Sequence, residues 1–419
     1  MSLQEDPLSS YLDHEVSGYD TQAYPSYFDT NDRFEPKFTS LIEYEHEIIS
    51  LKRFDDVGCS AISDIEVVNV DDFGAKGDGT EDDTEAFEKA WEKACSSTSA
   101  TTLVVPSYKN YLLKPVRFSG PCESDLTIKI YGTIEASDDR SDYELDFQHW
   151  LVFENIENFL VEGGGTINGN GDIWWENSCK INKSLPCTHA PTAITFNKCK
   201  NLRVANLKIK DAQQIHLSFQ KCVDVQASNL MVTAPEKSPN TDGIHVTKTQ
   251  NIQIESCVIG TGDDCISIVS GSENVQVIDI TCGPGHGISI GSLGSGNSEA
   301  HVSNVMVNRA VLSGTTNGVR IKTWQGSAVQ VRDVVYKNII GTSASEVAIK
   351  FNCSKSFPCL GIALDDIDLV SEGEGTSKAS CENVEWSEVG KVIVEYDAET
   401  IYSLYLSDIN VLLKQLDSF

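Results

Sequence analysis

The sequence lacks a membrane-length apolar run, a basic surface and a recognisable leader segment. In 419 residues, no apolar stretch approaches the ~20 residues of a membrane-spanning helix. Lys and Arg number 32 against 62 Asp and Glu, and a net charge of −30 argues against nucleic-acid binding, which needs a basic surface. The opening Met-Ser-Leu-Gln-Glu-Asp has neither the basic nor the apolar region of a signal peptide. The 40% hydrophobic and 22% charged content indicates a soluble globular protein.

Cysteine, in contrast, is plentiful. Six of the 13 cysteines fall into short-loop pairs, namely Cys179 with Cys187, Cys265 with Cys282, and Cys353 with Cys359. Buried thiols in a β core are one interpretation. Asn-X-Ser sequons at Asn182 and Asn352, beside two of these pairs, favour disulfides in a secreted glycoprotein. Because a secreted protein needs a leader, we expect the N-terminus as given to be mature, trimmed or incomplete.

The first 64 residues are acidic, rich in Tyr, Ser and Asp, and show little periodicity. We interpret residues 1–64 as a flexible arm or a removable pro-segment. Order is expected from Val67 onward. After a glycine-rich turn, Thr80 and Asp82 are predicted to cap an amphipathic helix with apolar positions at Phe87, Ala90, Trp91, Ala94 and Cys95. Such a helix would cover the open end of a repetitive β structure.

A repeated unit, in which Asn or Asp precedes an alternating apolar strand, dominates the middle of the chain. The units begin at Asn201, Asp224, Asn251 and Asn274, with looser copies at Asn304 and Asp333. Each strand cannot bury its inner face alone, so the units must stack. The spacing predicts an all-β fold, a single-stranded right-handed parallel β-helix over residues 65–385, followed by an atypical tail over 386–419. Leucine at fixed positions, as in a leucine-rich repeat, is missing, and propeller blades would be longer.

Four polar clusters within residues 238–322 recur about once per coil. They are Asn-Thr-Asp242-Gly, Gly-Asp263-Asp264, Gly-His286-Gly and Arg320-Ile-Lys322. The steps from Asp242 to Asp263 and from Asp263 to His286 are 21 and 23 residues, so we expect all six side chains on one face. Taken singly, the clusters allow other interpretations: a turn, a cap or calcium site, a structural histidine and a solvated strand face. Together they favour acid–base chemistry on an anionic ligand.

In this order, the four clusters resemble those of the plant polygalacturonases of glycoside hydrolase family 28. The segments 163–171 and 184–187 also resemble that family, and the likeness runs from about residue 67 to 383. The resemblance implies inverting hydrolysis of α-1,4-galacturonosyl bonds in pectin, outside the cell in the plant cell wall. It implies that Asp263 is the acid, and that Asp242 and Asp264 hold and deprotonate the water. Crowding of the three carboxylates is expected to raise one pKa and so keep a proton on the acid.

By the same resemblance, His286 tunes the acid, while Arg320 and Lys322 bind the carboxylate of polygalacturonate. No cofactor and no metal is expected, nor a membrane or nucleic-acid partner. We expect a monomer that cleaves inside the polymer.

The sequence departs from this family at three places. After Gly326, about one and a half coils that the family carries are missing, together with a substrate-site tyrosine. No cysteine follows Cys381, and the residues after about 386 do not match the usual tail. Because contacts in a solenoid are mostly between neighbouring coils, we expect the fold to survive and the activity to be weakened or lost. The alternatives are a non-catalytic pectin-binding β-helix and a pectate lyase, which would need calcium.

Overall fold

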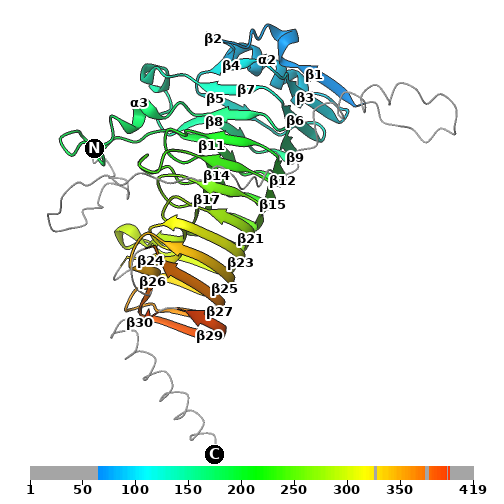
Figure 1. Ribbon diagram of the computed structural model, residues 1–419. Coiled ribbons are helices and arrows are strands. Elements are labelled where there is room, and N and C mark those ends of the chain that lie inside the picture. The colour runs from blue at the N-terminus through cyan, green and yellow to red at the C-terminus, as the bar shows by residue number, and fades with distance from the viewer. Residues whose placement is uncertain (1–64, 325–327, 373–376, 394, 397–419) are drawn as a thin grey trace, which may run out of the picture. The chain divides into compact units, whose positions relative to one another are not determined.

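Parallel strands stack coil upon coil through the part of the chain that the computed structural model describes, residues 65–324, 328–372, 377–393 and 395–396 (Figure 1). Within these ranges the strands form two sheets, of 19 and 11 strands, and each strand pairs with its equivalent on the next coil. The expected all-β, right-handed parallel β-helix is confirmed. No helix among the described residues has the length and apolarity needed to cross a membrane.

The larger sheet is built from β1 (Glu66–Asn69), β2 (Asp78–Asp82), β3 (Thr101–Val105), β4 (Asn110–Leu113), β6 (Leu126–Ile130), β7 (Thr133–Ala136), β9 (Glu157–Glu162), β10 (Thr166–Asn168), β12 (Lys200–Ala205), β13 (Lys208–Lys210), β15 (Val223–Ser228), β16 (Met231–Thr233), β18 (Gln250–Glu255), β19 (Val258–Gly260), β21 (Ser272–Cys282), β23 (Ala300–Thr315), β25 (Val329–Ser343), β27 (Cys359–Ser371) and β29 (Val384–Ile393). The second sheet is built from β5 (Val116–Ser119), β8 (His149–Glu154), β11 (Thr192–Asn197), β14 (Leu217–Gln220), β17 (Ile244–Thr247), β20 (Ile266–Ile268), β22 (Ile288–Leu293), β24 (Val319–Thr323), β26 (Val347–Asn352), β28 (Lys378–Glu382) and β30 (Glu395–Tyr396). Short helices η2 (Val70–Phe73), η3 (Arg140–Tyr143), α3 (Asp172–Trp175) and η4 (Ser295–Asn297) lie between strands.

Aliphatic side chains stack in columns inside the coils, one per coil. One column is at most 2% exposed and contains Leu202, Val225, Ile252, Val275, Val305, Val334 and Ile362. Burying each such side chain contributes about 1.5–3 kcal/mol, which explains why alternate positions of the repeat are apolar. The alternation therefore sets the register, because a shift by one residue would turn every column outward.

The Asn or Asp that opens each repeat has a left-handed backbone. Asn251 and Asn274 both have φ of 56°, a conformation that Asn and Asp tolerate better than other side chains. Their amides also bond along the stack, since Nδ2 of Asn274 donates to Oδ1 of Asn251 at 2.9 Å and Nδ2 of Asn304 donates to Oδ1 of Asn274 at 3.0 Å. The repeat seen in the sequence thus marks a fixed corner of every coil.

Helix α2 (Thr84–Cys95) lies at the N-terminal end of the described coils, where the expected capping helix belongs (Figure 1). Its buried face is the predicted one, with Phe87 and Trp91 at 2% and 5% exposure. The predicted cap is wrong, because the N-cap residue is Asp83 and both Thr80 and Asp82 belong to β2. Oδ1 of Asp82 nevertheless accepts the amide N–H of Thr84 at 3.0 Å.

Disulfides join all three pairs expected from the sequence: Cys179–Cys187, Cys265–Cys282 and Cys353–Cys359. A fourth disulfide, Cys95–Cys122, ties helix α2 to the segment after β5, and its 27-residue separation gave no local signal in the sequence. Cys381 is a buried thiol.

The coils stay in register across the place where the sequence predicts a missing segment. Residues 325–327 lie outside the described residues, but β24 pairs directly with β26, and β23 with β25. As expected, the fold survives. Strand β29 crosses the expected boundary at residue 385 and pairs with β27 to Ile393. The expected arm, 1–64, and residues 397–419 of the expected tail lie outside the described residues.

Candidate active site

The expected site residues meet on the outer face of the second sheet. Asp242, Asp264 and His286 each lie just before a strand (β17, β20 and β22), and Arg320 lies on β24. Backbone hydrogen bonds fix the first three positions, since Gly243 N–H donates to the Asp264 carbonyl and His286 N–H donates to the Asp263 carbonyl, both at 2.9 Å. A Cβ at Gly243 would lie 2.6 Å from the Cys265 carbonyl oxygen, so this close approach requires glycine.

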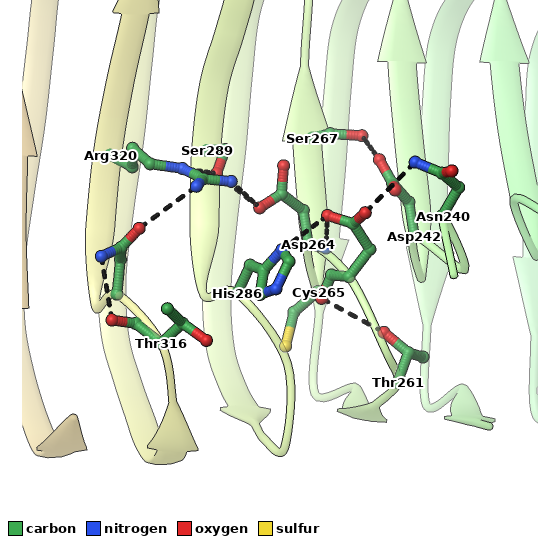
Figure 2. Close-up of polar contacts among 12 residues, drawn as sticks. Asn240, Asp242, Thr261, Asp264, Cys265, Ser267, His286, Ser289, Thr316 and Arg320 are labelled. Carbon is green, nitrogen blue, oxygen red and sulfur yellow. Dashed lines mark hydrogen bonds and ion pairs between the residues drawn. The ribbon is translucent and has the colours of Figure 1, made fainter. Parts of the chain in front are cut away.

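A row of polar side chains runs across the coils beside the carboxylates. His245, Ser267, Ser289 and Arg320 occupy the same position on successive strands β17, β20, β22 and β24. Figure 2 shows three members of this row, Ser267, Ser289 and Arg320, reaching toward Asp242 and Asp264. Because neighbouring parallel strands are ~4.8 Å apart, each member can hydrogen-bond to groups on the next coil.

Asp263 is held by His286. Its Oδ1 lies 2.8 Å from Nδ1 of His286 and accepts the amide N–H of Asp264 at 2.9 Å. Its Oδ2 accepts a longer hydrogen bond, 3.4 Å, from Nδ2 of Asn240. Burial on its own would raise the pKa of Asp263, but the hydrogen bond and charge of His286, helped by the charge of Arg320, lower that pKa. The side chains of Asp263 and His286 are 17% and 37% exposed, so both are open to a ligand.

Asp264 forms a buried ion pair with Arg320. Its Oδ1 accepts from Nη2 of Arg320 at 2.6 Å and from Oγ of Ser289 at 2.7 Å. The side chains of Arg320 and Asp264 are only 13% and 5% exposed. Burial, with the like charge of Asp263, raises the pKa of Asp264, although the charge of Arg320 opposes the shift.

Asp242 has a neutral hydrogen-bond partner. Oγ of Ser267 donates to Oδ2 of Asp242 at 2.6 Å, and Nδ1 of His245 lies 2.8 Å from the same hydroxyl. Burial, followed by the charges of Asp263 and Asp264, raises the pKa of Asp242 well above its ordinary value. Burial also lowers the pKa of His245 to about 4, so this imidazole is neutral at ordinary pH.

Two cations complete the site. Arg320 also donates from Nε to Oγ of Ser289 at 3.0 Å and from Nη1 to Oδ1 of Asn317 at 3.2 Å, so its guanidinium is fixed in one orientation. Burial lowers the pKa of Lys322, although Asp264 and the other two carboxylates oppose this. The charge of Lys180, on the loop closed by Cys179–Cys187, also acts on Asp263.

The structure therefore brings together all six residues predicted from the sequence. It also differs from one expectation, because burial and the neighbouring carboxylates raise the pKa of Asp242 and Asp264, whereas the pKa of Asp263 is lowered. The pKa of Asp263 is lowered because the imidazole of His286 contacts its carboxylate. The sequence did not single out Ser267, Ser289, His245 and Asn317, and Asn240 was found only as part of the Asn-Thr-Asp242-Gly cluster, without a role of its own. The first three could have been found by aligning the strands by coil, since they share the position of Arg320.

Donor atoms of Asp263, Asp264 and His286 lie within 4.8 Å of one another, which is close enough to share a metal ion. Two of these donors already have direct protein partners in the site. Oδ1 of Asp264 accepts from Arg320 and Ser289, and Nδ1 of His286 contacts Asp263. An adjacent guanidinium repels a cation, so the arrangement fits anionic ligands better.

This fold and this group of acids and cations define an acid–base hydrolase built on a parallel β-helix. The chain belongs to the glycosyl hydrolases family 28, whose model matches residues 95–338 and 325–392, and it is therefore a glycoside hydrolase. A second model, rhamnogalacturonase A/epimerase, pectate lyase-like, matches residues 67–114.

Plant proteins share more than half of the aligned residues with this chain. A polygalacturonase of Malus domestica is 54% identical over 432 residues, covering 92% of this chain and 92% of the relative. Polygalacturonase-2 of Solanum lycopersicum is 57% identical over 362 residues, covering 77% of this chain and 79% of the relative.

Two solved structures share the fold. The polygalacturonase from Erwinia carotovora ssp. carotovora has a TM-score of 0.62 at 22% identity, covering 82% of this chain and 100% of that one. The endo-xylogalacturonan hydrolase from Aspergillus tubingensis has a TM-score of 0.65 at 24% identity, covering 78% and 99%.

The comparisons also bear on the missing segment. The family model matches in two pieces that overlap at residues 325–338, at the place where the sequence predicts the excision. The alignment with the Malus domestica relative is 432 positions long yet covers only 92% of this 419-residue chain, so a few tens of its positions fall opposite gaps in this chain. Both observations agree with the loss of about one and a half coils.

Proposed function

We propose that this protein is a polygalacturonase that hydrolyses α-1,4-galacturonosyl bonds of polygalacturonate, the acidic backbone of pectin. The observation that carries the proposal is the grouping of three carboxylates with the fixed guanidinium of Arg320 and the half-buried Lys322 on one outer face. Carboxylates supply acid and base, and the two cations bind the carboxylate that distinguishes galacturonate from neutral sugars. The plant relatives that carry the name polygalacturonase support the same substrate.

In the proposed reaction, Asp263 donates a proton to the leaving glycosidic oxygen, and Asp242 and Asp264 activate the attacking water from the opposite side. This division gives inversion at the anomeric carbon, since the water attacks directly without a covalent intermediate. Arg320 and Lys322 hold the galacturonate carboxylate, and His286 controls the protonation of Asp263 through their 2.8 Å contact. No metal takes part in this scheme.

The reaction requires the proton on Asp263, whose pKa is lowered by His286 and Arg320. A bound carboxylate would offset the charge of Arg320 and so favour protonation of Asp263. Because Arg320 also lowers the pKa of Asp264, the same binding favours protonation of both carboxyls.

The test is an assay of reducing-sugar release from polygalacturonate, with Asp263→Asn as the control. Hydrolysis by inversion gives products of the opposite anomeric configuration, visible by NMR before mutarotation, and gives no ultraviolet-absorbing unsaturated ends. A pectate lyase would give unsaturated ends and would lose activity in chelator. Activity that persists in EDTA and disappears in the Asp263→Asn variant supports the hydrolase.

We further propose that the enzyme attacks inside the polymer. The resemblance to fruit-type polygalacturonases supports this proposal. Internal cleavage lowers the viscosity of polygalacturonate long before many reducing ends appear, whereas attack from chain ends changes both in proportion. A proportional time course would refute internal cleavage.

A non-catalytic pectin-binding protein is the second candidate function, and the division of the family match into two pieces at residues 325–338 favours it. Calorimetry with oligogalacturonate separates the two functions, because a pure binding protein gives heat of binding and no reducing ends.

In either case we propose a secreted monomer of the cell wall or apoplast. The four disulfides and the exposed sequon at Asn182 support secretion, while Asn352 lies in β26 with its side-chain oxygen buried. Glycan mapping and light scattering test these points.

A further inference from the structure

Lys350 extends the row of site residues by one coil beyond Arg320. Strand β26 pairs directly with β24, so that Arg320 aligns with Lys350 and Lys322 aligns with Asn352. The side chains of Ile349 and Phe351 are buried in the core, which directs Lys350 to the same outer face as Arg320. Lys350 is exposed, and no ion pair to it is found among the described residues.

The position of Lys350 depends on the shortened chain. The two pieces of the family match overlap at residues 325–338, between β24 and β26. Roughly one and a half further coils at that point would separate Lys350 from Arg320 by more than one strand spacing of ~4.8 Å. In this chain the two cations are on adjacent strands, so Lys350 becomes a neighbour of the site.

Two like charges in register on adjacent strands repel each other. Arg320 is partly compensated by Asp264, whereas Lys350 has no comparable partner among the described residues. An anionic group between or beyond them would relieve the repulsion and gain a charge-assisted hydrogen bond. A polymer that carries one carboxylate per sugar unit presents such groups in series along the stack of coils.

We propose that Lys350 binds the carboxylate of the galacturonate unit next to the one held by Arg320 and Lys322, and so adds a substrate-binding position toward the C-terminal coils. This inference rests on the proposed function, because it takes polygalacturonate as the ligand. Lys350 is a specificity residue here and has no part in the acid–base steps.

The test compares binding of oligogalacturonates of increasing length to the full chain and to Lys350→Gln by calorimetry. We expect Lys350→Gln to weaken binding of the longer oligomers about three- to tenfold and to leave the shortest bound oligomer unchanged. Lys350→Arg should restore most of the affinity. Lys200→Gln, which removes an exposed lysine from β12 of the other sheet, is the matched control and should bind normally.

Fully methyl-esterified oligomers give a second comparison. Because they carry no carboxylates, the wild type and Lys350→Gln should bind them equally. If the wild type binds acidic oligomers and Lys350→Gln binds every length equally well, the inference is wrong and the proposed function stands. If the wild type neither binds nor cleaves polygalacturonate, the proposed function itself fails, and this inference fails with it.

Discussion

Asp242→Asn should make the folded protein more stable while abolishing hydrolysis. Asp242 has the neutral Ser267 as its direct hydrogen-bond partner, whereas Asp264 has Arg320. An amide oxygen at position 242 can still accept from the Ser267 hydroxyl. The substitution therefore removes a buried negative charge without leaving a partner unsatisfied.

The size of the effect follows from the spacing of the coils. Two unit charges ~4.8 Å apart repel by about 3–4 kcal/mol at an effective dielectric constant of 20. Lys322 and uptake of a proton offset part of this repulsion. We expect a net gain of about 1–2 kcal/mol in the free energy of unfolding at neutral pH, or a Tm higher by roughly 2–4 °C.

The gain should depend on pH in a defined direction. Since the folded-state pKa of Asp242 is raised above the ordinary 3.8, the wild type loses stability as the pH rises from the unfolded-state pKa to the folded-state pKa. Below both values the carboxyl is protonated in both states, so the advantage of the variant should vanish in acid. Thermal unfolding followed by circular dichroism at pH 7.5 and pH 3.5 measures both quantities.

Asp224→Asn is the matched control. Asp224 is an exposed carboxylate that accepts a hydrogen bond from Asn251 in a row where asparagine is the usual residue, so this change should alter stability by less than about 0.5 kcal/mol. An Asp242→Asn variant that is less stable than the wild type at pH 7.5 would refute the electrostatic account of the site.

Three further changes test the site from other directions. Ser267→Ala removes a hydrogen bond that lowers the pKa of Asp242, so the acidic limb of the kcat/KM profile should move to higher pH. The control is Ser218→Ala, which lies one strand before His245 in the same row and should leave the profile unchanged. Arg320→Gln should lower kcat/KM by roughly a hundredfold or more. It should also move the acidic limb of the profile to higher pH, because Arg320 lowers the pKa of both Asp263 and Asp264. Arg320→Lys should restore part of the charge effect but little of the rate, since a lysine cannot make all three contacts of the arginine. Replacing both Cys265 and Cys282 with alanine removes their disulfide and should lower the free energy of unfolding by about 2–4 kcal/mol. Activity should fall as well, because Cys265 adjoins Asp264. Equal activity in the reduced and oxidised protein would contradict this expectation.

The sequence was most informative where one residue alone determines the backbone. Asn251 and Asn274 adopt a left-handed φ that few other side chains tolerate, so the repeat could be found and the length of each coil counted. Coil length then predicted that Asp242, Asp263 and His286 share a face. The hydroxyls of Ser267 and Ser289 need one further step, an alignment of the strands by coil, because serine is ordinary on a strand and acquires its role only through the register. The location of the shared proton depends on burial and on the ring position of His286, which no spacing in the sequence encodes.

From the sequence, the missing coils are expected to weaken or abolish activity. The contacts in the structure indicate a more specific effect. Among the described residues, the side-chain hydrogen bonds that position the three carboxylates come from residues 240–320, on or just before β17, β20, β22 and β24. Contacts in a solenoid are mostly between adjacent coils, so an excision beyond β24 leaves those contacts intact and changes what lies next to Arg320 and Lys322.

Substrate binding should therefore suffer more than the chemical step. Relative to a plant polygalacturonase that retains the full set of coils, we expect a raised KM for polygalacturonate and a kcat within about tenfold. The experiment measures initial rates over a range of polygalacturonate concentrations for both proteins at the same pH. A normal KM with a kcat lower by several orders of magnitude would show instead that the excision disturbs the acids themselves, through a displacement of Arg320 that breaks its contact with Asp264.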